Sequence, residues 1–250
     1  MEQTTLLSVE DLKVYYNTSL GSVKAVDGVD FTVRRNEVFG IAGESGCGKS
    51  TLAFSLMRLN KPPCFTVGGK IVFDDTDLLS LDEEKMRRQR WKSLSIIPQS
   101  SMNALNPCKR IEDQIIDAME EHEGITRDTA KVRIQKLLNS VGLSEDVAGM
   151  FPHELSGGMK QRAIIAMATA LSPKLVIADE PTTALDVNVQ RLVLQTLLEV
   201  KETLEASMLF ITHNMAVHAE IVDRLGIMYA GRIVELGDIN DLILLCLWHV

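Results

Sequence analysis

The sequence has few cysteines and no pairing pattern among them. Only four of its 250 residues are cysteine, and no two form a C-x-x-C pair. This spacing suggests neither a zinc site nor a disulfide framework, and we expect reduced thiols, as in a cytoplasmic protein. The four residues are Cys47, Cys64, Cys108 and Cys246.

Long apolar runs are absent as well. No uninterrupted apolar stretch approaches the roughly 20 residues of a membrane-spanning helix. Glu2 stands where a signal peptide needs positive charge. The sequence therefore predicts a chain that does not cross a bilayer by itself.

Positive charge is also scarce. The chain has 26 Lys and Arg against 34 Asp and Glu, for a formal net charge of −8. A protein that neutralises nucleic-acid phosphates needs a basic face, so we expect no nucleic-acid partner. One short basic run follows acidic residues and is typical of a solvated helix face; it consists of Arg87, Arg88, Arg90 and Lys92.

What the chain does contain is an ordinary globular composition, 46% hydrophobic and 24% charged. Segments typical of antiparallel strands lie at residues 6–16, 29–33 and 69–73. Uninterrupted apolar runs, typical of buried parallel strands, lie at residues 38–42, 175–178 and 208–211. We expect one domain over residues 1–250, with residues 1–100 and 171–240 forming an α/β core that includes an antiparallel β subdomain.

The middle of the chain changes to a helical period. One predicted helix face consists of Ile111, Ile115 and Met119. A second consists of Ile134, Leu137, Leu138 and Val141, between Thr126 as N-cap and Gly142 as the stop. We expect residues 101–170 to form a helical subdomain inserted in the core.

One motif carries phosphate chemistry. Residues 43–51 match G-x-x-x-x-G-K-[ST] between a buried strand and an amphipathic helix. The glycines let backbone N–H groups surround a β-phosphate, Lys49 adds positive charge, and Ser50 offers a hydroxyl to magnesium. The alternative is a chance match. The nucleotide-binding residues predicted here are Gly43, Ser45, Gly46, Cys47, Gly48, Lys49, Ser50 and Thr51.

Two carboxylates at a strand end complement this loop. Residues 175–178 lead directly into Asp179 and Glu180. Asp179 is expected to hold the magnesium shell, and Glu180 to polarise the attacking water. Such a pair can also be an ordinary strand-end loop, but together with a phosphate loop it predicts nucleotide hydrolysis.

A third motif points to a family. Residues 155–162, followed by an apolar helix at residues 163–171, closely resemble the signature motif of ABC ATPases. Other marks of the family follow in order: Gln99 resembles the Q-loop glutamine, Asp186 the D-loop aspartate and His213 the switch histidine. The resemblance implies a P-loop NTPase of ABC type, with a RecA-like parallel-sheet core, an N-terminal antiparallel β subdomain and an inserted helical subdomain.

The resemblance also implies the cofactors and the site. They are ATP and Mg²⁺, with metal ligands at Ser50, Gln99 and Asp179. The catalytic residues implied are Lys49, Gln99, Glu180 and His213. In this family each ATP lies between the P-loop of one subunit and the signature of another in a head-to-tail dimer. The second half-site implied here consists of Ser156, Gly157 and Gly158, at another helix N-terminus, together with Asp186.

Two residues have competing interpretations. Tyr16 matches the aromatic residue that stacks on adenine in this family, and Tyr15 is the alternative candidate for that role. The third interpretation is that Tyr16 is only a buried tyrosine of a strand. His213 is either a core histidine or a γ-phosphate contact, and its position favours the contact. The remaining histidines are assigned no chemistry: His122, His153, His218 and His249.

Within the family, residues 12–14, 24–29, 98–107 and 180–187 resemble the dipeptide and oligopeptide importers, a group that includes nickel importers. The implied partners are membrane permease subunits, a second ATPase subunit (a copy or a paralogue) and, indirectly, an extracytoplasmic binding protein. The implied location is peripheral, on the cytoplasmic face of the cell membrane. The identity of the transported solute rests on analogy alone.

Two alternatives and one departure remain. One alternative is a soluble ABC ATPase, but such proteins usually have coiled-coil insertions or two cassettes, which are not evident here. The other is a nucleotide-binding module that does not hydrolyse ATP, and the presence of Glu180 and His213 argues against it.

Subunits of the importer group usually continue beyond the strand region at residues 231–235, sometimes with cysteines that hold an iron–sulfur cluster. Residues 241–250 are atypical, and we expect a truncated or altered end.

Overall fold

The computed structural model describes residues 4–99 and 104–242. They fall into two compact units, one within residues 1–87, 177–179 and 207–250 and the other within residues 88–176 and 180–206. Strand β7 (Leu175–Asp179) is shared between them. The predicted division into a core and a helical insert at 101–170 stays a prediction, and most of the atypical end lies outside the described residues.

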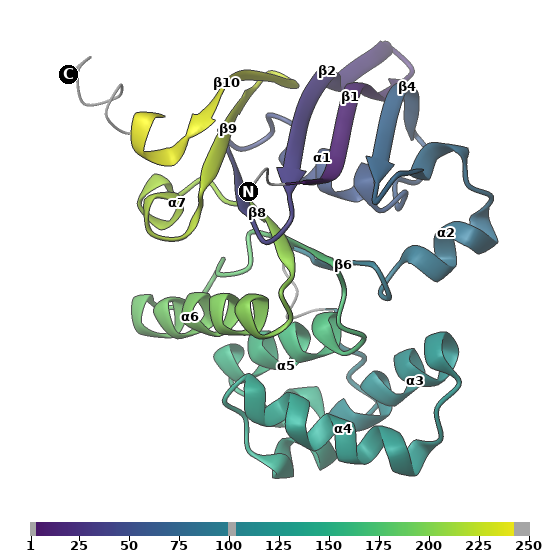
Figure 1. The fold of residues 1–250 in the computed structure, drawn as a ribbon, viewed down its shortest axis with the longest axis vertical. Coiled ribbons are helices and arrows are strands. Elements are labelled where there is room, and N and C mark those ends of the chain that lie inside the picture. Colours follow the sequence, from purple (N-terminus) through teal and green to yellow (C-terminus); the bar gives the residue numbers. More distant parts are fainter. Residues whose placement is uncertain (1–3, 100–103, 243–250) are drawn as a thin grey trace. The chain divides into compact units, whose positions relative to one another are not determined.

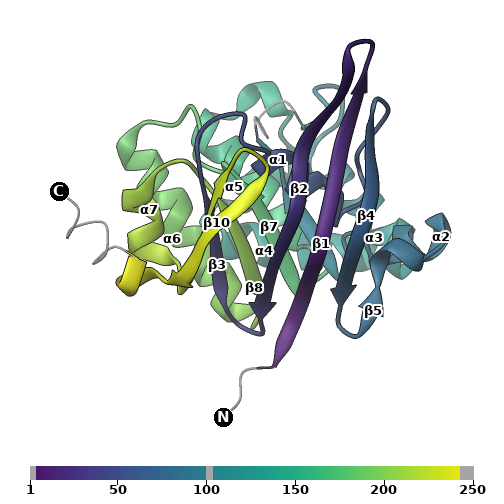
Figure 2. The ribbon, with the colours of Figure 1, turned by 90° about the horizontal axis from the view of Figure 1, so that it is seen from above.

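The first unit contains an antiparallel sheet with the strand order β2-β1-β4-β5. Figure 2 shows its long strands side by side. The residue alternation of β1 breaks at Asp11, which has a positive φ of 45°, and the register with β2 shifts there. This bulge lets Val9, Leu12 and Val14 all be buried. The strands are β1 (Thr5–Thr18), β2 (Gly21–Arg34), β4 (Cys64–Phe73) and β5 (Thr76–Asp77).

The second sheet has the order β10-β9-β3-β8-β7-β6. Its strand β3 (Val38–Ala42) pairs in parallel with β8 (Ser207–Ile211) and β9 (Arg224–Tyr229), and all residues of β3 and β8 are buried. The edge strands are β6 (Leu94–Ile97) and β10 (Arg232–Asp238), which is antiparallel to β9. The predicted α/β fold, with parallel core strands and an antiparallel sheet at the start, is confirmed.

Short helices accompany the strands of the first unit. Along the chain, α1 follows β3, and α7 connects β8 to β9. Figure 1 labels both helices. The helical segments are α1 (Lys49–Leu56), α7 (Met215–Ile221), the 3₁₀ turn at Leu78–Ser80, and α2 (Glu83–Gln89), which extends two residues past the unit boundary.

The second unit is mainly helical. Its helices are α3 (Ile111–Glu123), α4 (Arg127–Ser140), α5 (Gly157–Thr169) and α6 (Val187–Thr203), with 3₁₀ turns at Glu145–Gly149 and Pro152–Glu154. The predicted α3 face is buried, as are Ile134, Leu138 and Val141, whereas Leu137 is only half-buried. Thr126 is the α4 N-cap as predicted, and Gly142, with φ of 67°, follows the helix end.

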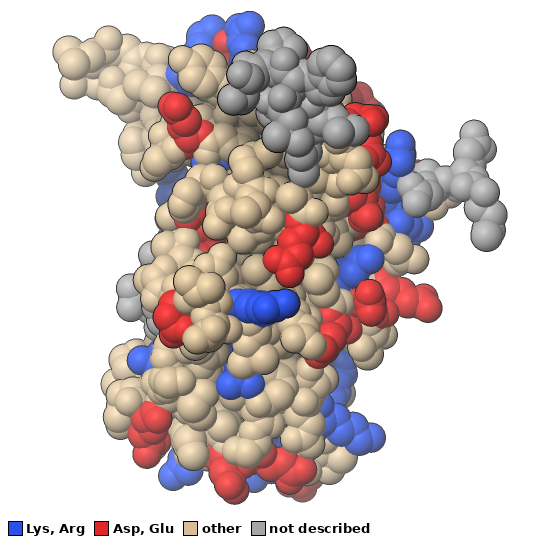
Figure 3. Space-filling model, turned by 90° about the vertical axis from the view of Figure 1, so that its left-hand side faces the viewer, with Lys and Arg blue, Asp and Glu red and all other residues tan. Residues whose placement is uncertain are grey.

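Within the described ranges, no helix has both the length and the apolar character needed to cross a membrane. On the face drawn in Figure 3, positive and negative side chains are interspersed.

A buried ion pair joins three strands of the first unit. Glu37, directly before β3, has a side chain only 4% exposed, and its carboxylate lies 3.0 Å from the guanidinium of Arg224 of β9. Its other carboxylate oxygen accepts the backbone N–H of Arg34 at 2.6 Å. Arg224 also donates to the carbonyl of Thr32 and lies 5.3 Å above the Phe39 ring. Removal of one side chain of the pair leaves the charge of the other buried without its counter-ion.

We therefore expect Glu37→Ala to destabilise the protein by about 3 kcal/mol, because the guanidinium of Arg224 loses its counter-charge in the interior. The measurement is urea unfolding followed by circular dichroism. The control is Glu220→Ala on the exposed face of α7, which should change stability by less than about 0.5 kcal/mol. Equal midpoints for the two variants would show that the pair does not stabilise the fold.

Candidate functional site

The glycine-rich loop between β3 and α1 is pressed against neighbouring backbone. A Cβ atom at Gly43 would lie 2.2 Å from the carbonyl oxygen of Met228, and one at Gly48 would lie 2.1 Å from that of Ala25. Gly48 also has a positive φ of 112°. Only glycine fits these positions, because any side chain would collide with main-chain atoms that cannot move aside.

Lys49 begins α1 and lies inside the curl of this loop. Its ammonium group donates to the carbonyls of Gly43 at 2.7 Å and Glu44 at 2.8 Å, and lies 3.7 Å from the sulfur of Cys47. The residue is only 6% exposed. A fixed positive charge thus sits beside the unpaired N–H groups of a helix N-terminus, an arrangement that attracts phosphate.

Ser50 and Thr51 occupy the first turn of α1, and both are half-buried, whereas Ser45 and Gly46 are exposed in the loop. The hydroxyl of Tyr16 lies 3.2 Å from that of Thr51, so the Tyr16 side chain reaches the loop end of α1. Tyr15 is turned elsewhere, since its hydroxyl donates to Asp27 at 2.6 Å.

Asp27 is a junction that the sequence motifs did not indicate. Besides Tyr15, its carboxylate accepts a hydrogen bond from Arg232 at 2.8 Å, and these donors hold the pKa of Asp27 well below its usual range. Its backbone N–H donates to Gly231, whose own N–H donates to Cys47 in the glycine-rich loop. Strands β2 and β10 are thereby tied to that loop.

Asp179 ends β7 and is fully buried. An ionised carboxylate in the interior costs free energy unless positive charge, hydrogen bonds or a metal ion compensates it. Among the described residues there is no cluster of three or more His, Cys, Asp or Glu that could hold a metal. Magnesium usually binds through one or two carboxylates together with phosphate oxygens and water, and a buried carboxylate is the type of ligand that it prefers.

Glu180 has an unusual backbone. Its φ is 48°, a left-handed conformation that is uncommon for a residue other than glycine. Its carboxylate accepts a hydrogen bond from the hydroxyl of Thr183 at 2.7 Å. Observed strain of this kind is often found where a side chain must be aimed in a particular direction. Sequence analysis predicted Glu180 as a site residue but neither its backbone conformation nor the contact with Thr183.

The signature residues form a helix N-terminus in the second unit. The expected helix N-terminus at Ser156, Gly157 and Gly158 is confirmed, because α5 begins at Gly157; it ends at Thr169, two residues before the predicted end at Leu171. Ser156 is the N-cap of this helix, and its hydroxyl accepts the N–H of Met159 at 3.3 Å. Gly157 and Gly158 therefore expose their N–H groups on the first turn.

Gly158 allows α5 to approach α6 closely. A Cβ there would lie 2.5 Å from a side-chain carbon of Val189. Val189 is in the first turn of α6, whose N-cap is Asp186; one carboxylate oxygen accepts the N–H groups of Asn188 and Val189 at 3.1 and 3.0 Å. The signature and Asp186 are thus held together within one unit.

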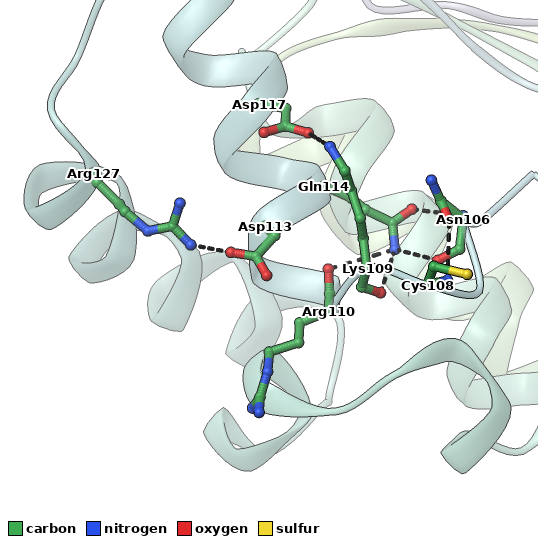
Figure 4. Close-up of polar contacts among 8 residues, drawn as sticks. All are labelled: Asn106, Cys108, Lys109, Arg110, Asp113, Gln114, Asp117 and Arg127. Carbon is green, nitrogen blue, oxygen red and sulfur yellow. Dashed lines mark hydrogen bonds and ion pairs between the residues drawn. The ribbon is translucent and has the colours of Figure 1, made fainter.

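Gln99 lies in the exposed turn after β6. The four residues that follow it, 100–103, lie outside the described residues. Gln114 of α3 then binds the backbone of Asn106 (Figure 4). The side-chain amide of Gln114 accepts the N–H of Asn106 at 2.9 Å and donates to the carbonyl of Asn106 at 3.2 Å. A nearby ion pair joins Lys109 to Asp117 at 2.6 Å.

His213 is exposed in the turn after β8, separated from the strand by Thr212. Asn214, the next residue, caps α7 by accepting the N–H of Ala216 at 3.0 Å. The first unit therefore contains the glycine-rich loop, Tyr16, Asp179 and His213. The second contains Gln99, Glu180, the signature and Asp186.

Comparisons with known proteins agree on one family. The sequence pattern of the ABC transporter family matches residues 26–183. The oligopeptide transport ATP-binding protein OppD of Bacillus subtilis is 43% identical over 242 residues, which cover 96% of this chain and 68% of that protein. The dipeptide transport ATP-binding protein DppD of Escherichia coli is 40% identical over 235 residues, covering 93% and 72%.

Solved structures show the same fold. A dimeric, post-hydrolysis structure of the ATP-binding cassette MJ0796 bound to ADP and Pi superposes with a TM-score of 0.82 at 24% identity, covering 94% of this chain and 99% of that one. The cbiO1 protein of Clostridium perfringens, part of the transporter complex cbiONQ, gives a TM-score of 0.80 at 26% identity, covering 97% and 92%. Sequence and structure together thus assign this chain to the ABC transporter family.

Proposed function

We propose that this chain is the ATP-binding and ATP-hydrolysing subunit that powers an ABC importer for di- or oligopeptides. The observation that carries the proposal is the glycine-rich loop closed around Lys49, with main-chain walls on two sides that leave room only for glycine. The names of OppD and DppD support the peptide assignment, since both are transport ATP-binding proteins at 40% identity or more.

In this proposal the loop N–H groups and Lys49 bind the β- and γ-phosphates, and Tyr16 stacks on the adenine. Ser50, Gln99 and Asp179 would supply oxygen ligands to a magnesium ion that accompanies ATP, whose charge offsets that of the phosphates. Burial of Asp179 supports its part, because a cation would compensate the carboxylate.

Glu180 orients and polarises the attacking water, and His213 contacts the γ-phosphate as charge develops on it. The hydrogen bond from Thr183 fixes the carboxylate of Glu180, which supports an aimed base. Gln99 links the site to the chain segment that follows it, which we propose transmits the nucleotide state to the permease.

The second half-site, consisting of Ser156, Gly157, Gly158 and Asp186, serves the nucleotide of another ATPase subunit in a head-to-tail dimer. That subunit is a second copy or a paralogue. The dimeric MJ0796 cassette provides the analogy. The other proposed partners are permease subunits and, indirectly, an extracytoplasmic binding protein, with this chain on the cytoplasmic face of the membrane. Nickel or another small solute is the alternative cargo, and the genes beside this one would name it.

Lys49→Ala should weaken ATP binding about 100-fold, because it removes the fixed charge that faces the β- and γ-phosphates. The measurement is the dissociation constant from isothermal titration with ATP and magnesium. Lys61→Ala, which removes an exposed lysine from the same unit, is the matched control and should bind as the unchanged protein does. Retention of full affinity by the Lys49 variant would exclude the loop as the ATP site.

Glu180→Gln should separate binding from hydrolysis. The amide keeps the size of the side chain but is a far weaker base, so we expect unchanged ATP affinity and a hydrolysis rate lower by about 10²–10⁴-fold. ATP-dependent dimers should accumulate, as size-exclusion chromatography would reveal. The control is Glu202→Gln on the exposed face of α6. Near-normal turnover in the Glu180 variant would remove this residue from the mechanism.

A further inference from the structure

His218 is a buried ionisable group that the proposed mechanism does not use. It lies on α7 with no exposed surface, and its ring packs edge-on against Phe210 of β8 with 5.9 Å between ring centroids. The opposite wall is β3, where a Cβ at Gly40 would lie only 2.7 Å from Nδ1. Strand β3 thus has glycine at the one position where the imidazole ring needs the space.

The ring makes one directed hydrogen bond. Its Nε2 lies 3.1 Å from the carbonyl oxygen of Thr212. A carbonyl can only accept, so Nε2 carries a hydrogen and donates it. Nδ1 is buried and has no hydrogen-bond partner among the described residues. Burial lowers the pKa of His218, and the positive charge of Lys49 acts in the same direction, against the opposing effect of the carbonyls of Thr212 and Ile41. Burial and Lys49 thus favour the neutral ring, in which the N–H is on Nε2 and Nδ1 has the lone pair.

The bond from His218 completes a set of contacts around the turn that presents His213. The N–H of Thr212 donates to Ile41 of β3 at 3.4 Å, and its hydroxyl accepts the N–H of Asn214 at 3.2 Å. The Thr212 carbonyl is held by His218, so its N–H, its hydroxyl and its carbonyl are all engaged. The next side chain, His213, is exposed. Because these contacts fix the position of Thr212, they also fix the position of the backbone of His213, the next residue.

We propose that His218 is a positioning residue for ATP hydrolysis: its Nε2–H fixes the Thr212 carbonyl and so places His213 toward the γ-phosphate. The inference rests on the role proposed above for His213. It assigns to His218 a part in hydrolysis rather than in ATP binding, since its hydrogen bond acts on the turn after β8 and not on the glycine-rich loop.

The test compares His218→Gln with His218→Met in the full chain. The two side chains are similar in length, but only the glutamine amide offers a donor near the place of Nε2. We expect kcat for ATP to fall about tenfold in the methionine variant with KM changed less than about twofold, because a small misplacement of His213 affects the transition state most. The glutamine variant should retain kcat within about threefold.

A measurement on the unchanged protein does not depend on whether variants fold. Nitrogen-15 NMR of the histidine side chains should show His218 as the neutral Nε2–H tautomer at about pH 7.5, because its pKa lies below the usual value. The Nδ1–H tautomer or a charged ring would overturn the inference. So would equal kcat in the methionine variant and the unchanged protein, or an equal loss in both variants.

The outcome for His213→Ala separates the two claims. If that variant hydrolyses ATP normally, the proposed role of His213 fails and the inference fails with it. If His213→Ala is inactive while His218→Met is fully active, the proposed function stands and only the positioning role is wrong.

Discussion

The glycine-rich loop can bind phosphate only if its backbone N–H groups converge, and this requires main chain to pack against main chain. Gly43 and Gly48 meet the carbonyls of Met228 in β9 and Ala25 in β2 at distances that no side chain permits. The antiparallel sheet is therefore part of the site, because β2 forms one wall of the loop. Asp27 secures that wall through its bonds to Tyr15, Arg232 and Gly231.

A second constraint acts on the signature residues. Gly158 must be small because Val189 of α6 lies where its side chain would be, and this contact keeps the Ser156 N-cap next to the Asp186 N-cap. The result is another helix N-terminus with free N–H groups, built by different elements from those of the glycine-rich loop. We interpret the two as halves of composite sites that form between two chains.

Motifs and apolar runs were sufficient to predict the fold class, because short buried strands and glycine patterns are local features. The close contacts of Gly43 and Gly48 were not predictable, since Met228 and Ala25 are remote from the loop in sequence. The hydrogen bond of His218 depends on a turn at the end of another element, so the residue was assigned no chemistry. The bulge at Asp11 depends on backbone conformation, which residue periodicity does not resolve.

The most direct test of the composite site uses the Ser156→Arg variant. ATP binding and ATP hydrolysis are both measured on the same preparation of this variant. In the proposed head-to-tail dimer an arginine at this position would occupy the space for the opposing γ-phosphate. The isolated monomer should bind ATP as before through its own glycine-rich loop. The rate of ATP hydrolysis should nevertheless fall to near zero. If the partner subunit is a paralogue, this rate is measured in the assembled pair. Ser144→Arg, an exposed serine in the same unit, controls for the added charge. Loss of ATP binding by the Ser156→Arg monomer itself would contradict a signature that acts across the interface.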